Sequence, residues 1–242
     1  IYLTQGEYTD DNERKTLVHK FSIGSSIIYG GSGKVEGYIS GGSNRDFRIN
    51  EHEGFLRLVT SKQERYTVAT NTYPFSAVRS IFVHNLFILK KATGELNLET
   101  IASLPNARQP EPIGKPDEDL YGVRFLGDRL YLVTYERIDP LYILDLSDHY
   151  NPIITGELEV KGFSDFLHPV NENLLLGLGA DENGLVKLEL FNVENLNNPF
   201  SLDSVLIGEG ADWNYSEARY NRKAFTYLNH STKMDKFTVP VS

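Results

Sequence analysis

One nine-residue pattern occurs twice in this chain, and its repetition limits the folds that the chain can adopt. Residues Leu144–Pro152 match Phe191–Pro199 with a shift of 47 residues, which carries Asp145 onto Asn192 and Pro152 onto Pro199. The apolar runs that precede the two copies also correspond to each other. A period of about 40–50 residues is typical of architectures that use one supersecondary unit many times.

The local pattern of the sequence is that of β-strands. Short runs rich in Val, Ile, Leu, Phe and Tyr, such as Phe55–Thr60, Leu130–Tyr135 and Lys187–Asn192, alternate with Gly, Asn, Asp and Pro. Helical periodicity is nearly absent, and this combination predicts an all-β protein. Several runs carry apolar residues on both faces, as expected for strands that are buried on both sides in stacked sheets.

Each repeat contains four such runs, so we predict a β-propeller of four-stranded antiparallel blades. Full blades are expected at about 44–104, 120–160 and 163–209. Residues 1–40 resemble the last three strands of a further blade, and residues 214–242 the first strands of another. About four to five blades' worth of sequence is present, which leaves open a small closed ring or a fragment of a larger one. We expect a long loop at residues 61–82, of the kind that often carries binding groups.

Five segments carry a resemblance to a known family: Asn50–Arg57, Val123–Asp128, Asp139–Ser147, Gly162–Pro169 and Ser216–Ala218. In these segments the chain resembles the β-propeller domain of secreted bacterial and archaeal proteins, a family without an assigned function. The resemblance implies an extracellular or cell-surface location, with an export signal upstream of Ile1. It also implies longer relatives, which favours the fragment of a larger ring, and it implies no catalytic residues.

Charge and composition exclude several classes of function. The chain has 24 Lys and Arg against 33 Asp and Glu in 242 residues, a net charge of −9, so we expect no nucleic-acid partner. It has no Cys, which excludes disulfides, thiolate metal sites and Cys nucleophiles. No run approaches the roughly 20 apolar residues of a membrane-spanning helix, so we expect no span within this chain.

Four charged residues fall at one position when the first strands of the predicted blades are aligned: Arg48, Arg124, Asp165 and Glu217. First strands line the central channel of a propeller, so we interpret this set as charges that neutralise one another around a partly wet channel. A second interpretation is a ligand site in which the arginines hold an anionic group. A third is a catalytic pair of Asp165 and Glu217, which would need a separation of about 5–10 Å.

Two further groups could bind a ligand. Asp181, Glu182 and Asn183 are a weak calcium candidate, because calcium takes six to eight oxygen ligands. The alternative is a hairpin turn, and apart from calcium we expect no cofactor. Trp213 and Tyr215 would stack on a sugar ring or a peptide if they were exposed, but we favour burial between blades for this aromatic cluster.

Together these features predict an extracellular, non-catalytic binding or scaffold module, whose ligand is a protein or a cell-surface polysaccharide. The alternative is a hydrolase or lyase that acts on an extracellular polymer, and a third reading is a structural spacer. An enzyme should have a deep cleft with a carboxylate of raised pKa. A binding module should have an exposed aromatic or apolar patch, and a spacer should have neither.

Overall fold

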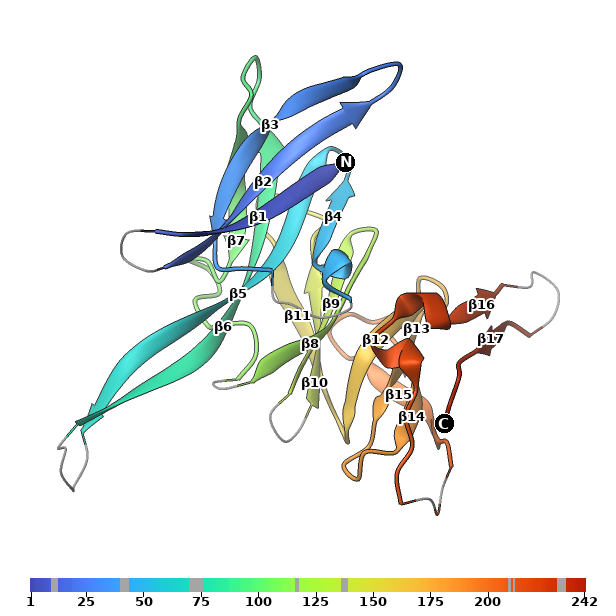
Figure 1. The fold of residues 1–242 in the computed structure, drawn as a ribbon. Coiled ribbons are helices and arrows are strands. Elements are labelled where there is room, and N and C mark those ends of the chain that lie inside the picture. The colour runs from blue at the N-terminus through green and yellow to red at the C-terminus, as the bar shows by residue number, and fades with distance from the viewer. Residues whose placement is uncertain are drawn as a thin grey trace. The chain divides into compact units, whose positions relative to one another are not determined.

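The computed structural model describes residues 1–9, 13–39, 44–69, 76–115, 118–135, 139–208, 210, 212–229 and 234–242. These residues form strands and three short 3-10 helices: η1 (Arg45–Arg48), η2 (Glu217–Arg219) and η3 (Arg222–Ala224) (Figure 1). Contacts between Cα atoms divide the chain into two units. The N-terminal unit contains Ile1–Ser40, Arg48–Glu118 and Asp148–Pro152, and the C-terminal unit contains Gly41–Phe47, Asp119–Ser147 and Ile153–Ser242.

The N-terminal unit contains two antiparallel sheets in which sequence neighbours pair. The first sheet has three strands: β1 (Tyr2–Tyr8), β2 (Arg14–Ile23) and β3 (Ile27–Glu36). The second has four strands: β4 (Ile49–His52), β5 (Phe55–Ala69), β6 (Ser76–Lys91) and β7 (Leu98–Leu104). Their apolar side chains share one core, formed by Val18, Val35, Leu56, Leu58, Leu89 and Leu98.

The predicted loop at residues 61–82 is wrong, because these residues continue the two long strands of a hairpin. The pairing of β5 with β6 runs without interruption from Phe55 opposite Lys90 to Ala69 opposite Ser76. The side chains are buried up to Ser61 and mostly exposed beyond Lys62. The outer part therefore has the polar composition of a loop but the backbone of a strand, and its residues 70–75 lie outside the described part.

The C-terminal unit contains two four-stranded sheets and a two-stranded hairpin. The first sheet consists of β8 (Asp119–Leu126), β9 (Arg129–Tyr135), β10 (Asp139–Asp145) and β11 (Ile153–Val160). The second consists of β12 (Phe163–Pro169), β13 (Leu174–Ala180), β14 (Val186–Asn192) and β15 (Phe200–Leu206). The hairpin pairs β16 (Thr226–Leu228) with β17 (Lys236–Thr238). The predicted all-β fold of four-stranded antiparallel blades is confirmed.

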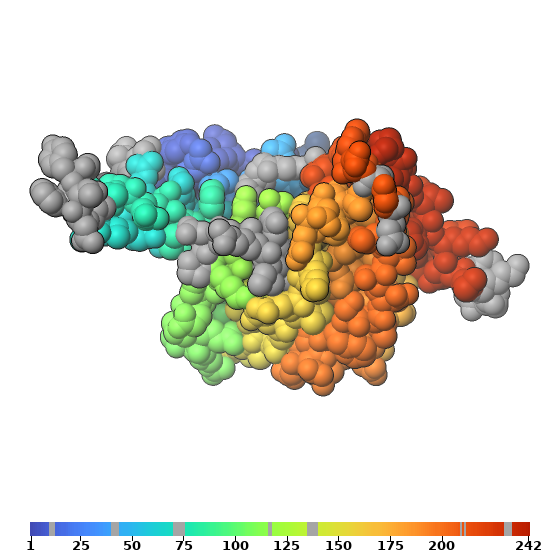
Figure 2. Space-filling view, turned by 90° about the horizontal axis from the view of Figure 1, so that it is seen from below, coloured from blue at the N-terminus to red at the C-terminus, as the bar shows by residue number. Residues whose placement is uncertain are grey.

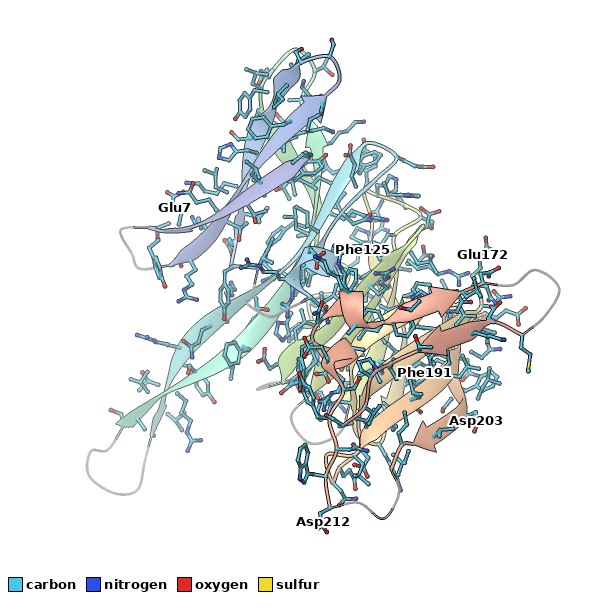
Figure 3. All side chains as sticks on the ribbon, turned by 45° about the vertical axis from the view of Figure 1, so that its right-hand side comes forward. Glu7, Phe125, Glu172, Phe191, Asp203 and Asp212 are labelled. Atoms are coloured by element: carbon cyan, nitrogen blue, oxygen red, sulfur yellow. The ribbon has the colours of Figure 1, made fainter. Side chains whose placement is uncertain are left out.

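The first strands of the two full blades of this unit, β8 and β12, contact each other. Between the blades lies a core of side chains such as Tyr131, Ile143, Leu167 and Phe191, the last of which is labelled in Figure 3. A second core surrounds Phe166 on β12 and includes the partly buried Phe47 and Phe225. Side chains on the first strands are thus held between packed aromatic and aliphatic groups.

The repeated segment forms the same turns in both copies. The side-chain oxygens of Asp145 and Asn192 each accept a hydrogen bond from the backbone N–H two residues later, at 2.9 and 3.1 Å. Asp148 and Asn195 do the same three residues further along, at 2.9 and 3.1 Å. Asp and Asn recur at these positions because their short side chains close such turns. Among the described residues, no helix is long and apolar enough to cross a bilayer.

Candidate functional site

The candidate site lies in the C-terminal unit, where three of the four predicted channel-lining residues are found. Arg124 lies on β8, Asp165 on β12 and Glu217 in η2. β12 contacts both β8 and η2, and η2 contacts η3. Side chains from η1, η2 and η3 therefore also belong to the group. The structure brings these residues into one unit, but it gives each of them a different partner.

Arg124 is a half-buried cation that stacks on an aromatic ring. Its Cζ lies 4.4 Å from the centroid of the Phe47 ring, and Cζ of Arg222 lies 5.5 Å from the same ring. Arg222 Nη2 is 2.9 Å from Asp46 Oδ2, whereas Arg124 makes no ion pair within the described residues. The buried Nε of Arg124 also has no hydrogen-bond partner there. Burial, followed by the charge of Arg222, lowers the pKa of Arg124, and Asp46 opposes this effect.

Asp165 is placed by a β-bulge. Ser164 pairs with Gly179 and Phe166 with Leu178, so that Asp165 is the extra residue on β12. Gly179 is required opposite the bulge, because a Cβ there would collide with the carbonyl oxygen of Phe163. The bulge therefore re-aims a charged side chain on a strand that otherwise packs into the core.

The Asp165 carboxylate forms a buried ion pair. It is 7% exposed, and its Oδ2 accepts a hydrogen bond from Arg219 Nε at 2.6 Å. Burial raises the pKa of Asp165 to about 6, although the charge of Arg219 acts in the opposite direction. Arg219 also lies over the rings of Phe163 and Tyr220, with Cζ 5.1 Å from each centroid. Asp165 is thus paired with Arg219 and not with Glu217.

Glu217 is exposed, and its carboxylate binds one aromatic and one amide side chain near η2. Its Oε2 accepts a hydrogen bond from the Tyr215 hydroxyl at 3.0 Å, and its Oε1 accepts one from Asn221 Nδ2 at 3.2 Å. The hydrogen bond with the Glu217 carboxylate raises the pKa of Tyr215. The rings of Tyr215 and Tyr220 are stacked, with centroids 6.1 Å apart and an angle of 17° between their planes.

The predicted burial of Trp213 between blades is wrong. Its side chain is 70% exposed, and Tyr215 is also exposed. Both belong to the segment that follows β15, which is coloured orange-red at the surface in Figure 2. Three exposed aromatic side chains, Trp213, Tyr215 and Tyr220, therefore lie within one short stretch of chain next to Glu217.

A hollow of about 420 Å³ adjoins this aromatic group. Its walls are Arg45, Asp46, Glu217, Tyr220, Asn221, Arg222 and Lys223, which are three cations, two carboxylates, an amide and a tyrosine. Asp165 does not contribute to it. The hollow thus offers hydrogen-bond donors and acceptors beside one ring of the stacked pair Tyr215 and Tyr220.

Arg48 lies elsewhere than the alignment of first strands predicts. It is the last residue of η1 and precedes β4, and it belongs to the N-terminal unit. There it is buried, and its Nη1 donates a hydrogen bond to Ser61 Oγ at 3.4 Å. Ser61 Oγ lies 2.9 Å from His84 Nδ1. These contacts give Arg48 a structural role within that unit.

Asp181, Glu182 and Asn183 form the turn between β13 and β14. Asp181 Oδ1 accepts hydrogen bonds from the backbone N–H groups of Asn183 and Leu185, at 3.0 and 2.8 Å, and its Oδ2 accepts one from Asn183 Nδ2 at 3.1 Å. Gly184 adopts a φ of +87°, which suits glycine at such a turn. These contacts favour the hairpin turn over calcium binding. In the described part of the chain, no three His, Asp or Glu side chains are grouped closely enough to hold a metal ion.

Comparison with known proteins decides the family. The profile of the beta propeller domain matches residues 1–242, the full sequence. The chain belongs to the beta propeller domain family. It is 43% identical over 211 residues to an uncharacterized protein of Archaeoglobus fulgidus, which covers 87% of this chain and 28% of that protein. It is 35% identical over 172 residues to an uncharacterized protein of Methanocaldococcus jannaschii, covering 71% of this chain and 23% of that protein. The chain thus spans about a quarter of the length of these two relatives.

In this propeller domain, several site residues were not predicted from the sequence. Arg219, Arg222 and Phe47 lie in short 3-10 helices or next to them, outside the repeated strand pattern. A larger hollow of about 860 Å³ in the N-terminal unit was also missed. Its walls include Tyr8, Arg14, Tyr38, Lys62 and Phe82. This hollow depends on Lys62–Arg65 and Phe82 of the β5–β6 hairpin, a segment that the sequence analysis interpreted as a loop.

Proposed function

We propose that this propeller domain is a non-catalytic binding module that works outside the cell or at its surface. Its ligand is a cell-surface polysaccharide or a protein, and the exposed aromatic group beside the hollow favours the polysaccharide. The observation that carries this proposal is the separation of roles at the site. Asp165 is buried against Arg219, while the open hollow is lined by Glu217, Tyr220 and neighbouring polar side chains.

The rival function, hydrolysis or elimination on an extracellular polymer, has one observation in its favour. A carboxyl with a pKa of about 6, as at Asp165, suits a general acid. A general acid must reach the substrate, however, and Asp165 is 7% exposed, engaged by Arg219 and absent from the hollow. Glu217 is held by Tyr215 and Asn221 rather than paired with Asp165. The geometry therefore supports binding more than catalysis.

The stacked rings of Tyr215 and Tyr220 and the exposed Trp213 suit a sugar ligand. A flat aromatic face buries the apolar face of a ring, and neighbouring carboxylate, amide and guanidinium groups exchange hydrogen bonds with its hydroxyls. Glu217, Asn221 and Arg222 supply such groups in the hollow. The extracellular location rests on the family resemblance.

The test is a pull-down of the domain on insoluble polysaccharides and cell-wall preparations, with and without calcium, followed by mass analysis of the supernatant. We expect retention without soluble fragments, and we expect Trp213→Ala and Tyr220→Ala to weaken it. Tyr66→Ala is the matched control, because Tyr66 is an exposed tyrosine on β5 in the other unit. Calcium-dependent retention would restore the acidic turn at residues 181–183 as a metal site.

Two outcomes would count against this function. Release of soluble fragments, abolished by Asp165→Asn or Glu217→Gln, would identify an enzyme. Absence of retention on every preparation would contradict a polysaccharide ligand.

A further inference from the structure

We propose that Arg124 and Arg222 form a subsite for an acidic group, so that the saccharide recognised here carries carboxylates and is not neutral. This inference rests on the proposed function, and it names the class of ligand for the same site. The two guanidinium groups share the ring of Phe47, and Arg222 lines the hollow together with Arg45 and Lys223, whereas Arg124 is not part of its walls.

The first step is the condition of Arg124. A guanidinium that leaves water loses hydration, and this loss is normally offset by hydrogen bonds or by an ion pair. Asp165 on the neighbouring strand β12 and Arg219 form such an ion pair. Arg124 has the face of Phe47 but, among the described residues, neither an ion pair nor a partner for its buried Nε. An oxyanion at the guanidinium would compensate its charge.

The second step is the position of Arg222. Its charge lies close enough to lower the pKa of Arg124, so the two cations repel each other. The bond between Arg222 and Asp46 is open to solvent, with side chains 52% and 46% exposed, and pairs of this kind contribute little and exchange readily. An acidic group bound between the two guanidiniums would relieve their repulsion and gain charge-assisted hydrogen bonds.

The third step is the charge of the hollow. Arg45, Arg222 and Lys223 outnumber Asp46 and Glu217 there, in a chain whose net charge is −9. A local excess of cations on an acidic protein favours a ligand with isolated acidic groups over a dense polyanion, which the rest of the surface would repel. The volume of about 420 Å³ lies toward the lower end of the range for small-molecule sites. A uronic acid residue within an oligosaccharide has this chemistry.

The experiment compares two probes with the same sugar backbone, one with free carboxylates and one with neutral methyl esters. Trigalacturonate and its methyl ester are titrated separately into the domain by isothermal calorimetry, and sulfated trigalactose serves as a third probe to separate carboxylate from sulfate recognition. We expect the acid to bind at least about tenfold more tightly than the ester. Arg124→Gln should remove this advantage by lowering the affinity for the acid to about that for the ester.

Matched variants separate the subsite from general effects. Lys236→Gln removes the same charge from β17, outside the hollow, and should keep the preference for the acid. Tyr220→Ala should weaken both probes. Thermal unfolding supplies a second readout, because removing an unpaired guanidinium should leave the melting temperature unchanged or higher, whereas a structural Arg124 would make it fall.

The outcomes distinguish this inference from the proposed function. Equal binding of acid and ester, or an acid preference that survives in Arg124→Gln, overturns the inference and leaves the binding module intact. A preference for the sulfated probe replaces carboxylate by sulfate. Binding of none of the probes, together with no retention in the pull-down, overturns both, and Arg124-dependent binding of a polyglutamate peptide instead would assign the site to an acidic protein.

Discussion

Two arginines of the C-terminal unit show how the partner of a buried charge determines its role. Arg219 is compensated by Asp165 at 2.6 Å, so that the pair connects η2 with the bulge of β12. Arg124 stacks on the face of Phe47 and is stabilised by the charge of Asp46, but it makes no ion pair within the described residues. Removing one member of a buried pair leaves the other charge uncompensated, whereas removing an unpaired charge does not. Replacing Arg219 would therefore leave the buried Asp165 carboxylate without its partner, whereas Arg124 is the cation on which the proposed acidic subsite depends.

The titration of Asp165 should be visible in the stability of the protein. Burial raises the pKa of Asp165 from 3.8 to about 6, so between these values the folded protein binds a proton more tightly than the unfolded chain. The contribution of this group to the free energy of unfolding therefore falls as pH rises from about 4 to about 6, by about 3 kcal/mol, and is constant above this window.

Urea unfolding of the wild type and of Asp165→Asn at pH 4, 5, 6 and 7 measures this effect. The difference in unfolding free energy, wild type minus variant, should decrease through the window. Asp203→Asn, at an exposed carboxylate on β15, is the control. A difference that rises with pH would show instead that Arg219 holds the pKa of Asp165 below its ordinary value.

At the residue scale, the sequence predicted part of the candidate site. Arg124 and Asp165 do lie on the first strands β8 and β12, which contact each other, but Arg124 pairs with Tyr131 near the end of β8 whereas Asp165 is the bulge residue near the start of β12. Arg48 ends a 3-10 helix instead, because η1 occupies the place at which the alignment expected a strand. The partners Arg219 and Arg222 come from irregular segments, whose positions depend on packing and not on a strand period.

At the scale of elements, the hairpin β5–β6 shows why the sequence of some strands predicts a loop. Alternation of apolar and polar residues marks a strand when one of its faces is buried. Beyond Lys62 both faces of this hairpin are mostly exposed, so its sequence lacks the alternation of apolar and polar residues that marks a half-buried strand. The turns of the repeat, in contrast, have a local cause in the sequence, because Asp and Asn close them through their own side-chain hydrogen bonds.

The outer part of this hairpin should be dispensable for folding. Residues 64–81 can be deleted by joining Gln63 to Phe82, which pair across the hairpin, through an Asn-Gly turn; the described side chains that this removes are mostly exposed. We expect the free energy of unfolding to change by less than about 1 kcal/mol, because little apolar surface loses its burial. Urea unfolding followed by circular dichroism measures it. Loss of a cooperative transition would show that the outer hairpin supports the fold.

At the scale of the whole molecule, the repeat predicted the order of strands within each sheet. In every sheet, neighbours in sequence are neighbours in space, as in propeller blades. The period depends on turns and alternating burial, which are local properties. The division of the chain into two units depends on contacts between residues far apart in sequence, and the repeat contains no information about them.

The two units contain separate apolar cores, and this leads to a prediction about how the molecule loosens. Leu58 is fully buried in the core of the N-terminal unit, and Ile143 is fully buried in the C-terminal unit. Truncation of either to alanine should reduce the free energy of unfolding by about 2–5 kcal/mol. Because each core is formed by strands of its own unit, amide exchange should accelerate first in the unit that carries the substitution.

Hydrogen exchange with mass spectrometry, at denaturant concentrations well below the unfolding transition, can locate the loosened amides. In Leu58→Ala the fast-exchanging peptides should come from β2, β3, β5 and β6, and in Ile143→Ala from β9, β10 and β13. Val205→Ala, at an exposed residue of β15, should change neither set. If both core variants instead accelerated exchange equally throughout the chain, the two units would unfold as one cooperative structure, and a ligand bound at the hollow would then stabilise the N-terminal unit as strongly as the C-terminal one.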